Sequence, residues 1–115
     1  EKSERKYQKG IRSMKVTEVK VYLIPGKEKL RATATITLDN AFMVHGLKVI
    51  EGDTGLFVVM PAVKKNGVFK DIAHPITAEM RNQIVTAVLA EYARREEERL
   101  TQPEEEVYEQ ETEEE

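Results

Sequence analysis

Residues 30–38 show an unbroken alternation of apolar and polar side chains, which limits the folds open to this chain. Five apolar residues alternate there with one arginine and three threonines; the apolar positions are Leu30, Ala32, Ala34, Ile36 and Leu38. A period of two sends successive side chains to opposite faces of a β-strand, so the pattern predicts one buried face and one wet face. Such one-sided strands are typical of antiparallel sheets, because parallel sheets are usually covered on both faces.

Turn signals bound this strand on both sides. Residues 15–24 are rich in β-branched and aromatic side chains and predict a preceding strand, which Pro25-Gly26 ends. Asp39-Asn40 predicts a two-residue turn, since both residues tolerate a positive φ angle. The chain is therefore expected to run back as a hairpin after this turn.

Further strand signals follow the hairpin turn. Residues 41–50 predict the returning strand, and its apolar positions change parity at Gly46, which indicates a β-bulge. The remaining signals before the helix are a loop over 51–55, a short apolar strand over 56–60, a turn over 64–67 and a last short strand over 68–72.

One helical pattern follows the strands. Thr77 is the expected N-cap, with Glu79 in the first turn, where the helix dipole favours a carboxylate. Apolar residues then recur every four positions along one face, at Met80, Ile84, Val88 and Tyr92. The pattern predicts a helix of about 18 residues with a solvated extension towards Leu100. The whole order predicts an α+β fold: an antiparallel meander of four to five strands followed by a C-terminal helix packed on the sheet.

The charge is distributed unevenly along the chain and divides it into three parts. Residues 14–95 carry 12 basic and 8 acidic residues, a net charge of +4, and form the expected folded domain. Residues 1–13 have a net charge of +3 and are expected to be a disordered extension or cloning remnant, or alternatively a basic arm. Residues 96–115 hold 11 glutamates and are expected to be a largely disordered acidic tail. The overall charge of −3 therefore conceals a mildly basic body.

Composition excludes several kinds of site. The chain has no cysteine and only two histidines, so it offers no disulfide, no thiolate ligand and no visible metal site. His45 and His74 are expected to be structural, as are the carboxylates of Asp39, Asp53 and Asp71 at turns and strand ends. No apolar run approaches the roughly 20 residues that span a bilayer. We therefore expect a cytoplasmic protein with no membrane contact, metal, cofactor or small-molecule substrate, and no enzymatic activity.

The predicted sheet has two edges, and these edges suggest how the chain assembles. An edge strand that neither proline nor charge protects is able to pair with a strand of another chain. A core of about 80 residues also gains stability from a partner. We therefore expect a homodimer formed by edge-strand pairing.

Five segments of the patterned region resemble a known protein family. They are Met14-Lys-Val-Thr-Glu-Val, Leu30-Arg-Ala-Thr-Ala-Thr-Ile-Thr-Leu-Asp39, Phe42-Met-Val-His-Gly-Leu-Lys-Val-Ile50, Gly55-Leu-Phe-Val-Val-Met-Pro61 and Phe69-Lys-Asp-Ile-Ala-His-Pro-Ile76. Over about residues 14–92 the chain resembles the stage V sporulation protein G family, also called septation proteins. Members usually carry a serine and then a basic pair after Met-Pro, whereas here Ala62-Val63 precedes Lys64-Lys65 and shifts the pair by one residue.

This resemblance implies a bacterial cytosolic protein in which a β-sheet domain with a C-terminal helix forms dimers. It also implies regulatory binding to preferred sites on DNA, and in some members to RNA, in sporulation, septation and gene regulation. No enzymatic activity is established for the family. The alternative is a protein-interaction adaptor in cell division or gene control that binds no nucleic acid directly.

Basic side chains are the candidates for contacting phosphates, because neutralising phosphates releases counterions and gives sequence-independent affinity. The candidates are Lys64, Lys65 and Lys70 first, then Lys48, Arg31 and Arg81. The alternative is an ordinary solvated surface, since 12 basic residues in 82 is common for a globular domain. Arg94 and Arg95 are equally suited to the C-terminal end of the helix.

Two further expectations concern the aromatic residues and the acidic tail. Phe42, Phe57, Phe69 and Tyr92 are expected in the core, so stacking platforms for single-stranded nucleic acid are not expected. The tail is either a solubility segment or a tethered polyanion that competes with DNA for the same lysines, at an effective concentration of about a millimolar.

Overall fold

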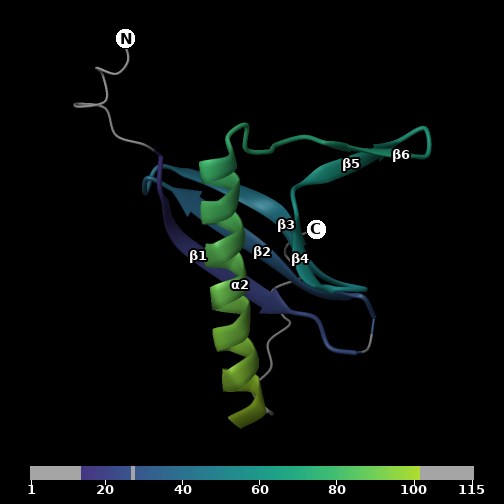
Figure 1. The fold of residues 1–115 in the computed structure, drawn as a ribbon, viewed down its shortest axis with the longest axis vertical. Coiled ribbons are helices and arrows are strands. Elements are labelled where there is room, and N and C mark those ends of the chain that lie inside the picture. The colour runs from purple at the N-terminus through teal and green to yellow at the C-terminus, as the bar shows by residue number, and fades with distance from the viewer. Residues whose placement is uncertain (1–13, 27, 102–115) are drawn as a thin grey trace.

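A four-stranded antiparallel sheet, one long helix across it and a projecting hairpin make up the fold (Figure 1). The structure is a computed structural model that describes residues 14–26 and 28–101. The expectations for residues 1–13, and for the acidic tail beyond Thr101, lie outside the described residues. The predicted α+β arrangement is confirmed, because the strands come first and the helix then packs on one face of their sheet.

The main sheet follows the chain as a meander. Its strands, each antiparallel to the next, are β1 (Val16–Leu23), β2 (Leu30–Leu38), β3 (Phe42–Gly52) and β4 (Gly55–Val59). The alternation of β2 defines the core face, to which Ala32, Ala34 and Ile36 point. Thr35 is buried on the opposite face, where its hydroxyl lies 3.2 Å from Nδ1 of His45, so this face is not wet along its whole length.

The predicted turn between β2 and β3 is confirmed. Asp39 and Asn40 both have φ angles of 52°, the left-handed values of a tight two-residue hairpin turn. The N–H of Ala41 donates to the carbonyl of Leu38 (2.9 Å), and the N–H of Lys15 donates to the Asp39 carboxylate (3.0 Å). Asp39 therefore has the structural role predicted for it.

The predicted bulge at Gly46 is also confirmed. The register between β2 and β3 shifts from Ala34 opposite Leu47 to Ile36 opposite Val44. Gly46 has a φ angle of 91°, a left-handed value that favours glycine. The bulge turns the apolar side chains from both halves of β3 towards the same face, which explains the change of parity in the sequence.

The loop predicted over 51–55 is mostly strand. β3 continues to Gly52, β4 begins at Gly55, and only Asp53 and Thr54 remain as the turn between them. The prediction failed here because two glycines and an aspartate suit a tight hairpin turn as well as they suit a loop.

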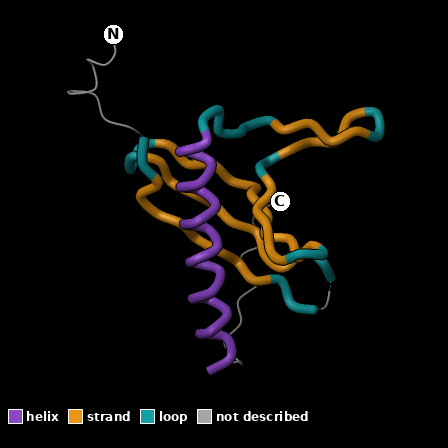
Figure 2. Tube along the Cα trace, in the orientation of Figure 1, coloured by secondary structure: helices purple, strands orange, loops and turns teal. Residues whose placement is uncertain are grey.

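A second sheet of two strands is absent from the predictions. β5 (Ala62–Lys65) and β6 (Val68–Asp71) pair with each other, apart from the main sheet, and project from it as a hairpin (Figure 2). The turn predicted over 64–67 is shorter in the structure and consists of Asn66-Gly67, with φ angles of 54° and 81°. Asn-Gly is the preferred pair for this two-residue turn, so the local signal was present.

The helix α2 (Ala78–Thr101) begins where the sequence predicts it and packs mainly against β1. The hydroxyl of Thr77 accepts a hydrogen bond from the N–H of Met80 (3.1 Å), which confirms the N-cap. The helix also continues into the predicted solvated extension. The helical residues in the described part of the chain include no apolar stretch of the length that a membrane span requires.

One core joins the helix to all four strands of the main sheet. Its buried members are Val21, Leu23, Ala32, Ala34, Ile36, Leu47, Val49, Val58, Met60, Ile84, Val88 and Tyr92. Hydrogen bonds fix the position of the helix over β1: Gln83 accepts from the N–H of Val16 (2.6 Å), and Arg95 donates to the carbonyl of Val21 (2.8 Å). Side chains of the helix are thus hydrogen-bonded to backbone groups of β1, which is an edge strand of the sheet.

The exposure of the aromatic residues contradicts the prediction that they all lie in the core. Tyr92 is buried, but Phe42, Phe57 and Phe69 are 64%, 47% and 66% exposed. The prediction of a core position was wrong for all three phenylalanines. Strand periodicity shows that a face is apolar, whereas burial also requires a second layer over that face. The helix supplies this layer only for the central part of the main sheet.

Candidate nucleic-acid interface

The hairpin of β5 and β6 carries three of the six candidate residues. The opposed pairs across it are Val63 with Lys70, Lys64 with Phe69, and Lys65 with Val68. Because side chains alternate along a strand, Lys65 and Lys70 share one face and Lys64 lies on the other. All three lysines are exposed.

The charges of these lysines are not neutralised by acidic side chains of the described residues. No described carboxylate oxygen lies within 4.0 Å of Nζ of Lys64, Lys65 or Lys70. Nζ of Lys64 lies instead 5.5 Å from the ring centroid of Phe69, in a cation–π arrangement. Asp71 is the only acidic residue of the hairpin. The hairpin is therefore a projecting ribbon with positive charge on both faces.

Lys48 lies on the main sheet, close to the base of this hairpin. It is half-buried, and it points away from the helix because its neighbours Leu47 and Val49 point into the core. Lys48 pairs with Val59, the last residue of β4. The chain enters the hairpin three residues after Val59, at Ala62.

Arg31 does not join this group. Its guanidinium lies 3.8 Å from the carboxylate of Glu51 and donates to the carbonyl of Glu28 (3.3 Å). The hydroxyl of Tyr92 is the main cause that raises the pKa of Arg31, and the charges of Glu51 and Glu96 add to it. The structure thus places Arg31 close to Tyr92 of α2 and to Glu51 of β3.

The arginines of the helix also differ in their surroundings. Arg81 is exposed in the first turns of α2, at the end of the helix that the hairpin precedes (Figure 1). Arg94 pairs with Glu91 (2.7 Å) and Glu98 (3.2 Å) along the same helix. The structure therefore brings three candidate lysines together on the hairpin, with Lys48 near its base. Arg81 lies apart on the helix.

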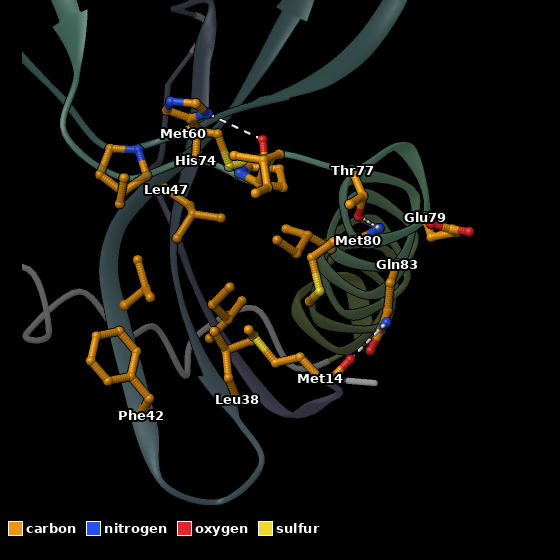
Figure 3. A pocket seen from close by; sticks show the side chains of 17 residues that line it. Met14, Leu38, Phe42, Leu47, Met60, His74, Thr77, Glu79, Met80 and Gln83 are labelled. Atoms are coloured by element: carbon orange, nitrogen blue, oxygen red, sulfur yellow. Dashed lines mark hydrogen bonds between the residues drawn. The ribbon is translucent and has the colours of Figure 1, made fainter. Parts of the chain in front are cut away.

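An apolar cavity at the base of the hairpin is absent from the sequence predictions. It has a volume of about 620 Å³ and lies between the first half of β3 and the N-terminal turns of α2 (Figure 3). Apolar side chains such as Phe42, Val44 and Met80 form most of its wall. The sequence signal for this cavity was weak, because its walls come from segments far apart along the chain.

The two histidines have structural contacts. The Nδ1–H of His74 donates to the carbonyl of Pro75 (3.1 Å), in the connection that leads to the helix, and Nδ1 of His45 faces the hydroxyl of Thr35. Within residues 14–26 and 28–101 no group of three or more histidines and carboxylates is placed to hold a metal ion. The candidate site therefore consists of the basic side chains of the hairpin and the apolar side chains of the cavity.

Comparison with known proteins gives a consistent result. The family model described as SpoVG matches residues 14–94. A protein of Anaeromyxobacter sp. (strain Fw109-5) is 54% identical over 82 residues, which cover 70% of this chain and 84% of that protein. A protein of Clostridium acetobutylicum is 47% identical over 95 residues, which cover 80% of this chain and 100% of that protein. A protein of Myxococcus xanthus is 50% identical over 82 residues, or 70% of this chain and 82% of that protein. All three are named "Putative septation protein SpoVG".

Proposed function

Because the chain belongs to the SpoVG family, we propose that it is a regulatory protein of septation and sporulation that binds preferred sites on DNA as a homodimer. RNA is a second ligand for the same basic surface. The observation that carries the proposal is the hairpin of β5 and β6, which exposes Lys64, Lys65 and Lys70 on a projecting ribbon.

The lysines of the hairpin support binding to duplex DNA. Lys65 and Lys70 share one face of the hairpin and are placed to contact phosphates, and the released counterions supply affinity that does not depend on sequence. Lys48 extends the basic surface from the ribbon towards the main sheet.

The edges of the main sheet support a homodimer formed by edge-strand pairing. Gln83 and Arg95 of the helix occupy backbone groups of β1, which blunts that edge. The other side of the sheet, along β4 and the first half of β3, has no comparable cover among the described residues. A pair of chains joined on this side doubles the number of lysines available to one DNA duplex.

The test is a salt titration of binding with matched variants. Lys65→Ala/Lys70→Ala removes two hairpin charges, and Lys20→Ala/Lys29→Ala removes two exposed charges elsewhere. Fluorescence anisotropy is measured with duplex DNA, single-stranded DNA and RNA. In a dimer the hairpin variant is expected to flatten the slope of log K against log salt by about 2–4, since each neutralised phosphate contributes about 0.9. An unchanged slope, or an equal change in the control, would contradict the role of the hairpin.

The exposed phenylalanines favour a second candidate function, that of a protein-interaction adaptor. Phe42 and Phe69 are each about two-thirds exposed, which suits recognition of another protein surface as well as self-association. Phosphate contacts are strong at about 50 mM salt. If the full chain binds none of the tested nucleic acids under this condition, the adaptor function is favoured.

A further inference from the structure

The hairpin carries apolar side chains that no other part of the described chain covers. Phe69 is 66% exposed, Val68 is 55% exposed and Val63 is 43% exposed. In β5 and β6 every residue except Ala62 is exposed, so the hairpin contacts little besides itself. An isolated two-stranded hairpin is only marginally stable in water. The hairpin therefore has the composition of an element that packs on another surface.

The first half of β3 is an open strand edge. β4 pairs with β3 only from Lys48 to Gly52, so among the described residues 42–47 have β2 as their only strand neighbour. Phe42 and Met43 at this edge are 64% and 49% exposed. An apolar edge of this kind is able to accept an added strand.

The cavity lies directly behind this open edge. Its walls include Phe42 and Leu47 of β3 and Met80 of α2 (Figure 3). Val44 of β3 and Ile84 of α2 also line it. Its volume of about 620 Å³ is ample for an aromatic side chain. A strand added to the edge of β3 would send every second side chain into the cavity.

We propose that a second copy of this chain fills the cavity: its β6 pairs with residues 42–47 of β3, and its Phe69 enters the space behind them. This inference rests on the proposed homodimer and specifies its interface. The chain's own hairpin projects away from its own sheet (Figure 1), so a second copy is the source of the strand. A two-fold axis lets each hairpin occupy the other copy's cavity and closes the assembly at two chains.

Alternation of side chains decides which face of the hairpin turns inward. Phe69 shares its face with one lysine, whereas the opposite face carries both Lys65 and Lys70. Placing Phe69 inward avoids burying those two charges. It also leaves them on the side of the sheet opposite the helix, where Lys48 of the receiving copy lies. One continuous basic surface then contains lysines from both copies.

The apolar area that two copies would bury in this contact is large enough to favour association. A buried phenylalanine covers about 150–250 Å². Phe42 and Phe69 of two copies, each about two-thirds exposed now, would supply roughly a third of the ~1,600 Å² of a standard interface. The backbone pairing of β6 with β3 adds to this contact.

Site-directed crosslinking of the full chain tests the contact, because the chain has no native cysteine. Phe42→Cys and Phe69→Cys are made in separately tagged chains, mixed, and treated with a short bismaleimide. A covalent dimer that joins the two different tags is the expected product. The control mixes Phe69→Cys with Leu100→Cys, at the far end of α2, and is expected to give no crosslink above background. A double variant with both cysteines in one chain reports whether the hairpin folds back on its own body.

Sedimentation distinguishes a failure of the proposed hairpin exchange from a failure of the proposed homodimer. Phe69→Arg is expected to weaken dimerisation at least 100-fold, while Leu100→Arg leaves it unchanged; circular dichroism confirms that both variants fold. A Phe69→Arg chain that remains dimeric, or a crosslink that forms within one chain, overturns the hairpin exchange and leaves the homodimer in place. A wild-type chain that is monomeric at all concentrations overturns both, whereas DNA binding is judged separately by the Lys65→Ala/Lys70→Ala salt slope.

Discussion

The charged side chain of Arg31 makes contacts that stabilise the fold. Its contacts with Glu28, Glu51 and Tyr92 join β2 to the turn before it and to the helix. Arg31→Ala is therefore expected to lower the free energy of unfolding by about 1 kcal/mol, because it removes these partly exposed contacts. Urea denaturation measures this loss, and nucleic-acid affinity is expected to stay unchanged.

Lys65→Ala is the matched comparison for Arg31→Ala. Lys65 is exposed on the hairpin and has no described carboxylate partner, so its loss is expected to weaken nucleic-acid binding without changing the urea midpoint. If Arg31→Ala weakens binding as much as Lys65→Ala while stability is unchanged, the structural role of Arg31 is wrong.

Tyr92 gives the stability of the protein a pH dependence at the alkaline end. Burial raises the pKa of its hydroxyl above the usual 10.0, partly offset by Arg31. The neutral hydroxyl therefore favours the folded state fully below pH 10, and this stability is lost as pH rises above 10. Urea midpoints from pH 8 to 11 are expected to fall more steeply for the wild type than for Tyr92→Phe. Parallel curves would count against this account.

At the scale of the elements, α2 depends on its N-terminal cap. Thr77→Ala removes the hydroxyl that accepts from the N–H of Met80 (3.1 Å) and is expected to cost about 1 kcal/mol. Thr86→Ala, at an exposed position in the same helix, is the control and is expected to be neutral or slightly stabilising, because alanine is the better helix former. Thermal or urea unfolding compares the two, and equal losses would contradict the capping role.

The hairpin shows how far local signals identify an element. Asn66-Gly67 marks its turn, and that signal is legible in the sequence. The partner strand, β5, is short and follows Pro61, so the basic pair Lys64-Lys65 was predicted in the turn although it lies in the strand. The separation of this hairpin from the main sheet has no local signal, because it depends on where β4 ends against β3.

At the scale of the whole molecule, the acidic tail and the basic hairpin start from opposite ends of α2. The helix has 24 residues, or about 36 Å, and Thr101 ends it far from the hairpin (Figure 1). Truncation after Thr101 removes eight of the 21 acidic residues. DNA affinity at low salt is expected to change less than about twofold, as for a solubility segment.

A larger gain in affinity after truncation would support the other reading of the tail. A tethered polyanion at about a millimolar effective concentration would compete for the hairpin lysines, and its removal would strengthen binding in a salt-dependent manner. A truncation that also removes Leu100 and Thr101 is unsuitable as a control, because it shortens α2.

Local sequence patterns were sufficient to predict the order of the main elements, the apolar face of β2, the turn at Asp39-Asn40, the bulge at Gly46 and the cap at Thr77. These features depend on backbone sterics and on the period of side chains within a few consecutive residues. Only the three-dimensional arrangement shows that Arg31 lies close to Tyr92 of α2, that three phenylalanines are exposed, and that a cavity opens beside β3. Each of these outcomes depends on whether a segment distant along the chain covers a given face, and side-chain period within one strand carries no information about such cover.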